Sequence, residues 1–225
     1  MSVTSRGEST LGPDHTGLIV FDALNVFMKP KNRPDKKKFL KENNIIGSMK
    51  AVLEGARKAG LTSFYPAAGY EADGSDVVLD RLTDSDMDLR PWNLDKPRPV
   101  IPRSDHDQQV ISELKPAKGD VYLPKHRWSA FYATDLEFQL KMRNIDTVII
   151  IGGSTDVGVA STAFAARDMD LGLVVVRGAC FSTRGENNDF FMDRVFPRMG
   201  RVLSVEDTVA LMLAGAKKIE MNSRK

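Results

Sequence analysis

The chain alternates short apolar runs with longer stretches in which apolar residues recur at helical spacing. The first apolar run begins at Gly17 and continues until Asp22 brings the first polar side chain. A continuous run of this kind is typical of a strand that is buried on both faces of a sheet. Later runs predict further strands over 61–68, 120–125, 146–153 and 171–182, and a short sixth strand over 201–204.

The stretches between these strands carry apolar residues three and four positions apart, which predicts amphipathic helices. The longest predicted helix runs from Lys36 to Gly60, where the glycine is expected to end it. Other helices are predicted over 134–143, 157–169, 187–199 and 206–218. Strands that alternate with helices favour a mainly parallel sheet with helices on both faces. We therefore expect one domain over residues 1–225, a three-layer αβα fold around a six-stranded sheet.

The segment from Gly69 to Pro102 breaks this alternation. It is rich in Asp, Gly, Pro and Arg and has no sustained period. A loop of this length inside a compact domain is usually functional or mobile. We interpret it as a surface excursion that covers a site or a subunit contact.

Composition narrows the choice of partners. The chain has 32 basic and 30 acidic residues, a formal net charge of +2, so no strong overall field favours nucleic acid or a membrane surface. The N-terminus lacks the pattern of a signal peptide, and no apolar run reaches the roughly 18 residues that span a bilayer. We expect a cytoplasmic protein that acts on a small molecule. The single cysteine, Cys180, excludes an internal disulfide and a cysteine-based zinc cluster.

Three positions with chemical potential stand at predicted strand ends. Asp22 follows the first strand, Lys125 ends the third, and the turn that contains Gly158 follows the fourth. Because ligands of parallel sheets bind beyond the carboxyl ends of the strands, we expect these positions to meet. A carboxylate beside an ammonium group is either a proton-transfer pair or a structural ion pair, and the spacing alone leaves both open.

The stretch from Lys125 to Ser182 resembles the isochorismatase-like hydrolases, also called the cysteine hydrolase superfamily, which includes nicotinamidase, carbamoylsarcosine hydrolase and isochorismatase. The matching features are a Lys before Ser-Ala-Phe, a Thr-Asp-Leu helix start and a Gly-x-x-Thr turn. The resemblance extends over roughly 16–213. It implies a catalytic Asp, Lys and Cys, of which Asp22 and Lys125 are present, whereas Gly158 stands at the place of the nucleophilic Cys.

The resemblance also implies the surroundings of this site. It places a cis peptide at Gly153-Ser154, and an oxyanion hole at the backbone N–H groups of Val157 and Gly158, at the positive end of a helix. The candidate substrate-binding residues are Gly153, Ser154, Val157, Phe27 and Trp128.

Several other roles are not expected. Some family members bind a metal through histidines after the second strand, but the matching segment 67–76 contains none, so we expect no metal and no cofactor. His126 is expected to be a polar neighbour of Lys125, and Cys180 a packed, inert thiol. The cluster His126–Trp128 is too short to predict nucleic-acid binding. The resemblance implies a homo-oligomer, either a dimer or a tetramer.

Glycine at position 158 leaves three hypotheses open. In the first, the site hydrolyses a bond without a covalent intermediate, as isochorismatases with Gly at this position do to a vinyl ether, and Gly158 leaves space for a bulkier substrate ring. In the second, the site is that of an amide or carbamoyl hydrolase without its nucleophile, and Gly158→Cys restores activity. Loss of a nucleophile costs about six decades of rate. In the third, the protein is a binding or interaction module without turnover.

Overall fold

Six parallel strands form the centre of the computed structural model, which describes residues 10–73, 75–76 and 102–223. The strand order is β3-β2-β1-β4-β5-β6, so β1 and β4 are neighbours at the middle of the sheet. The chain winds in one direction from β1 and in the other from β4, which makes the gap beyond their ends the switch point where ligands bind in such sheets. The strands are β1 Thr16–Phe21, β2 Thr62–Ala68, β3 Val121–Lys125, β4 Thr147–Gly153, β5 Gly172–Phe181 and β6 Arg201–Leu203.

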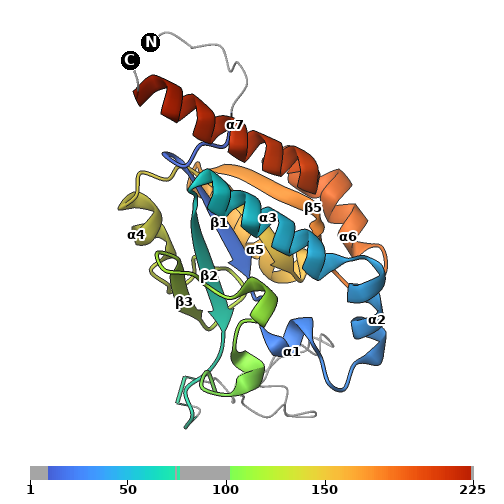
Figure 1. Cartoon of the computed structure of the whole chain (residues 1–225). Helices are drawn as coiled ribbons and strands as arrows, with labels where there is room; N and C mark the ends of the chain where they lie inside the picture. The colour runs from blue at the N-terminus through green and yellow to red at the C-terminus, as the bar shows by residue number, and fades with distance from the viewer. Residues whose placement is uncertain (1–9, 74, 77–101, 224–225) are drawn as a thin grey trace.

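Helices cover both faces of the sheet, as the alternation of elements predicted (Figure 1). One face is covered by α3 (Ile45–Ala59) and α7 (Val205–Ser223), and the other by α4 (Leu136–Lys141) and α5 (Ala160–Asp168). The short helices α1 (Asn25–Met28), α2 (Pro34–Glu42) and α6 (Asn187–Phe190) lie toward the carboxyl ends of the strands (Figure 1). None of the helices within the described ranges is long and apolar enough to cross a membrane.

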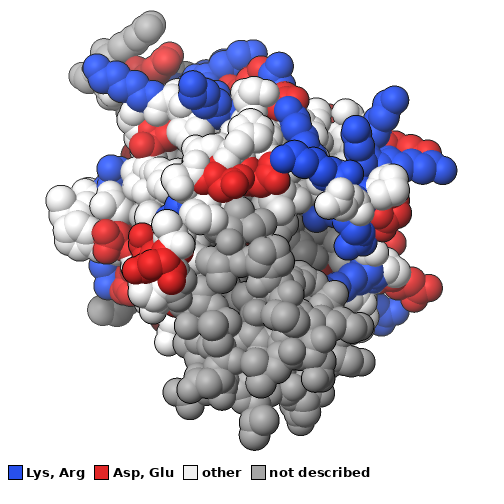
Figure 2. Space-filling model, turned by 90° about the horizontal axis from the view of Figure 1, so that it is seen from below, with Lys and Arg blue, Asp and Glu red and all other residues white. Residues whose placement is uncertain are grey.

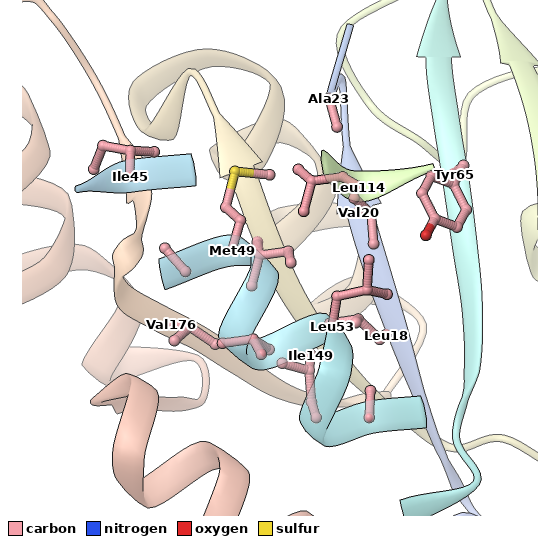
Figure 3. Packing of buried hydrophobic residues seen from close by; sticks show 14 of the residues in the cluster. Leu18, Val20, Ala23, Ile45, Met49, Leu53, Tyr65, Leu114, Ile149 and Val176 are labelled. Carbon is pink, nitrogen blue, oxygen red and sulfur yellow. The ribbon is translucent and has the colours of Figure 1, made fainter. Parts of the chain in front are cut away.

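Alternate residues of β1 enter different cores. Leu18 and Val20 pack with Met49 and Leu53 of α3 in the core that Figure 3 shows. Ile19 and Phe21 point to the opposite core, which α4 and α5 cover. Successive side chains of a strand face opposite sides of a sheet, and here both sides are buried, which explains the uninterrupted apolar run. The last strand residue, Phe21, therefore faces the side on which α5 begins.

Three predicted helices differ from the observed ones. The helix predicted from Lys36 to Gly60 is two helices, because Asn44 adopts a left-handed conformation with φ of 49° between α2 and α3. The helix predicted over 157–169 begins with a π-helical turn, η3 (Thr155–Val159). The helix predicted over 187–199 consists of α6, a π-helical turn over Phe191–Val195 (η4) and a 3₁₀ turn over Phe196–Arg198 (η5). Most of the excursion over 69–102 lies outside the described residues.

Candidate active site

Asp22 and Lys125 form a buried ion pair at the carboxyl ends of the strands. Asp22 Oδ2 lies 2.9 Å from Lys125 Nζ, and the two side chains are only 9% and 4% exposed. Asp22 follows β1 and Lys125 ends β3, while the strand between them, β2, supplies the N–H of Ala68, which donates to Asp22 Oδ1 at 2.9 Å. The structure thus brings together the two side chains that the sequence placed at separate strand ends.

The backbone of Asp22 fixes the direction of its carboxylate. Its φ of 46° lies in the left-handed region, which few residues other than glycine adopt, although Asp and Asn do so more readily than most. Its N–H donates to the carbonyl of Pro66 in β2 at 3.1 Å. The chain therefore turns at Asp22 toward β2, so both the backbone and the carboxylate of this residue are hydrogen-bonded to that strand.

The ammonium group of Lys125 has three partners. Besides Asp22, its Nζ donates to the carbonyl of Arg127 at 3.2 Å and lies 4.6 Å from the centre of the Phe21 ring. A cation at this distance from an aromatic face is attracted by the ring quadrupole. Lys125 is therefore held in place from several sides, and Phe21 is part of that support.

The same Phe21 ring fills the place of a side chain at Gly158. A Cβ atom on Gly158 would lie 2.3 Å from Cε1 and 2.4 Å from Cζ of Phe21, far inside van der Waals contact. Phe21 is 1% exposed and buried in the core, so its ring has little room to move. This corrects one expectation, because the Phe21 ring, not free space for a substrate ring, lies where a side chain at Gly158 would point. Gly158→Cys would require this ring to move, and the activity expected of that variant stays a prediction.

The turn that carries Gly158 is fixed by hydrogen bonds to the carboxylate of Asp156. The Gly153-Ser154 peptide is cis, as the resemblance implied. Asp156, with a side chain 3% exposed, accepts hydrogen bonds from Ser154 Oγ and, at 2.6 Å, from Asn187 Nδ2. Burial raises the pKa of this carboxyl, but the hydrogen bonds outweigh burial and lower the pKa overall. Asp156 is therefore a buried anion that ties the turn to α6.

One of the two expected oxyanion donors is already engaged. The N–H of Val157 donates to the carbonyl of Ser154 at 3.2 Å, and so does the N–H of Val159. In this conformation the N–H of Val157 is not free to donate to a substrate. Gly158 remains the candidate donor of the expected pair.

Trp128 and Phe27 complete the set of candidate substrate-binding residues. Trp128 is 41% exposed, and its carbonyl oxygen lies 3.4 Å from the position of a Cβ on Gly158. Phe27, in α1, lies with its ring centre 5.5 Å from the Nζ of Lys36. Sequence reasoning missed Lys36, because it stands in a run of three lysines that is typical of a solvated helix face.

Cys180 and His126 have partners of their own. Cys180 is 2% exposed, its thiol donates to the carbonyl of Ile150, and burial raises its pKa to about 12, so it is unreactive in the folded chain. The Nδ1 of His126 lies 2.9 Å from Asp76, and the guanidinium of Arg103 contacts the same imidazole. Across the described ranges, no group of three or more His, Cys, Asp or Glu side chains is arranged to hold a metal ion.

Comparisons with known proteins match this chain to the isochorismatase family. The model of the isochorismatase domain matches residues 16–207. The isochorismatase family protein YecD of Escherichia coli O157:H7 is 35% identical over 145 residues, which are 63% of this chain and 76% of that protein. The ureidoacrylate amidohydrolase RutB of Cronobacter turicensis is 30% identical over 172 residues, 72% of this chain and 73% of that protein.

Solved structures share the fold. A cysteine hydrolase from Pseudomonas syringae pv. phaseolicola superposes with a TM-score of 0.74 at 24% identity, over 92% of this chain and 96% of that one. The N-carbamoylsarcosine amidase of Thermoplasma acidophilum superposes with a TM-score of 0.65 at 28% identity, over 85% of this chain and 97% of that one.

Proposed function

This chain belongs to the isochorismatase family and is a hydrolase, and we propose that it cleaves a small organic substrate without forming a covalent bond to it. The observation that carries the proposal is the combination of an intact Asp22–Lys125 pair with a Phe21 ring in the place of the nucleophile. A site that had only lost its cysteine would leave a gap at this position. Here the gap is filled, which supports a site rebuilt for a reaction that needs no thiolate.

Cleavage of a vinyl ether is the reaction that this site supports best. It requires a proton donor and water but no nucleophile on the enzyme. Protonated Asp22 gives its proton to the terminal carbon of the double bond, a C–H bond forms, and the positive charge comes to rest on the carbon bonded to the ether oxygen. Water adds to that carbon and returns a proton to Asp22. The resulting hemiketal separates into a carbonyl compound and an alcohol.

The role of Lys125 follows from its distance to the acid. When Asp22 has given up its proton, the ammonium group 2.9 Å away stabilises the carboxylate that remains. The site is shielded from water, so this charge interaction is stronger than it would be at the surface. Lys125 thereby lowers the energy of the step in which charge develops, while Ala68 holds the other carboxylate oxygen.

Hydrolysis of an amide or carbamoyl bond is the second candidate. It is favoured by the relatives, since RutB is named for ureidoacrylate and the solved amidase for N-carbamoylsarcosine. Asp22 would then act as a base on water. Without the thiolate such catalysis is about six decades slower when the nucleophile has simply been removed, which is why the vinyl ether ranks first.

The test measures turnover by the unmodified protein on a panel of vinyl ethers, amides and ureido compounds. We expect hydrolysis of a vinyl ether, no substrate adduct of the protein by mass spectrometry, and a fall in kcat of about 10²- to 10⁴-fold in Asp22→Asn. The matched control is Asp168→Asn, which changes an exposed carboxylate at the end of α5 and should retain activity.

Three outcomes would contradict the proposal. A trapped covalent adduct would show that another side chain acts as a nucleophile. Turnover confined to amides or ureido compounds would favour the second candidate. Ligand binding without any turnover, unchanged in Asp22→Asn, would identify a binding module.

A further inference from the structure

Lys36 is a lysine in an unusual environment beside the candidate site. It lies in the first turn of α2 and is half-buried, unlike its exposed neighbours Lys37 and Lys38. Its Nζ lies 5.5 Å from the ring centre of Phe27 and 5.5 Å from that of Phe181. The ammonium group thus lies within cation–π distance of two aromatic rings, one from α1 and one from the end of β5. It forms no ion pair with any carboxylate among the described residues.

Two basic and two acidic side chains act on the charge of Lys36. Burial, first of all, and the charges of Arg33 and Arg184 outweigh the opposing charges of Asp35 and Asp22, and the net effect lowers the pKa of Lys36 to about 8. Asp35 is itself paired with Arg33 at 2.9 Å, so the effects of these two opposite charges on Lys36 partly cancel. Figure 2, which looks at the edge of the sheet where the strands end, shows Lys and Arg side chains gathered on the side of α2.

Lys36 is connected to the turn of the candidate site through Phe181. The centre of the Phe181 ring lies 5.5 Å from Lys36 Nζ, and Cε1 of the same ring lies 2.5 Å from the position of a Cβ on Gly153. Asp22 is close enough to influence Lys36 by its charge. The lysine and the Asp22–Lys125 pair therefore share one end of the sheet, with Lys36 at its α2 side.

A half-buried ammonium group that has no carboxylate partner in the described part of the chain favours an anion that completes it. Two aromatic rings beside the ammonium favour a flat, unsaturated carbon frame attached to that anion. We propose that Lys36, Phe27 and Phe181 form a subsite for the carboxylate of the substrate, which is a small unsaturated or aromatic carboxylic acid. This inference rests on the proposed function, because it places the bond to be cleaved next to Asp22.

The test uses two probes that the enzyme cannot hydrolyse. Benzoate and nitrobenzene have almost the same shape, but only benzoate is charged. We expect the unmodified protein to bind benzoate at least tenfold more tightly than nitrobenzene in calorimetric titrations. Lys36→Met should abolish this preference, while Lys37→Met, which removes the same charge from the same helix, should retain it.

The pH dependence distinguishes binding from a structural role. The pKa of Lys36 is about 8, so its ammonium group loses its proton above that pH and the affinity for benzoate should fall as the pH rises through 8 and beyond. The groups that set this titration are Arg33, Asp35, Arg184 and Asp22. Lys36→Arg should bind benzoate with no such fall, because the guanidinium stays charged.

Equal affinity for both probes in the unmodified protein would overturn the subsite, as would no binding of benzoate at about 10 mM. If Lys36→Met lost affinity for both probes equally, and Lys36→Arg did not restore it, Lys36 would have a structural role instead. Because neither probe is a substrate, the result is independent of turnover. A preference for benzoate without vinyl-ether hydrolysis would support the subsite and contradict the proposed reaction. Vinyl-ether hydrolysis without a preference for benzoate would support the reaction and contradict the subsite.

Discussion

Phe21 and Gly158 are a coupled pair of residues. The ring of Phe21 occupies the space in which a side chain at position 158 would stand, and the same ring lies over the ammonium group of Lys125. A change at either position therefore affects the packing of the other and the support of the ion pair. Residues that share one volume in this way have effects on stability that do not add.

This coupling predicts how a cysteine at position 158 behaves. We expect Gly158→Cys alone to lower the free energy of unfolding by about 1–3 kcal/mol, because the new side chain is forced against a buried ring. The double variant with Phe21→Ala and Gly158→Cys should lose less free energy of unfolding than the two single variants lose together, by about 1 kcal/mol or more. Urea denaturation of the four proteins measures both quantities. A Gly158→Cys variant as stable as the parent would show that the ring moves aside at no cost.

At the scale of elements, the junction of α2 and α3 decides where Lys36 lies. The pattern of apolar residues continues across this junction, but Asn44 turns the chain with a φ of 49°. This turn separates α2 from the helix that packs on the sheet. The N-terminal part of α2 is thereby free to lie against the rings of α1 and β5 rather than continue the line of α3.

Replacement of Asn44 tests this junction. Asn44→Ala should lower the free energy of unfolding by about 1–2 kcal/mol, because Ala adopts the left-handed conformation less readily than Asn. Asn44→Gly should cost little, since glycine adopts this conformation without strain. Thermal unfolding followed by circular dichroism compares the two variants. If both variants lost the same stability, the Asn44 side chain rather than its backbone conformation would be the important feature.

At the scale of the whole molecule, the order of the strands creates the site. The neighbours β1 and β4 separate the two halves of the sheet, and the residues that follow them, Asp22 and the turn to Gly158, lie at the same edge of the sheet. Lys125 reaches Asp22 from two strands away. The expected dimer or tetramer stays a prediction, which light scattering of the purified protein, with a chain mass of 24.9 kDa, would decide.

The reactivity of the Cys180 thiol can be used to measure whether the sheet is intact. Because it is buried within β5 and burial raises its pKa to about 12, we expect a disulfide reagent to modify it only when the sheet opens. The unfolded thiol ionises above its ordinary pKa of 9.0, so this residue favours unfolding increasingly as the pH rises from about 9 toward 12. Reaction rates in increasing urea give the measurement, with fully unfolded protein as the control. Rapid labelling of the native chain would contradict the buried placement.

Much of the architecture could be predicted from the sequence, and the reason is physical. Apolar runs mark strands that are buried on both faces, so the six strands lie close to their predicted bounds. Helix bounds were less well predicted, because apolar periodicity does not register a single left-handed residue such as Asn44, or the division of the stretch after Asn187 into short helical turns.

By itself, the sequence determined the parallel sheet, the positions of Asp22 and Lys125 at strand ends, and the glycine in the turn after the fourth strand. Only the tertiary structure decided what occupies the space at Gly158 and which lysine lies beside two aromatic rings. Phe21 is 137 positions from Gly158, and Phe181 is 145 positions from Lys36, as their residue numbers give by subtraction. Contacts over such separations depend on how strands and helices pack, and local hydrophobic periodicity carries no information about them.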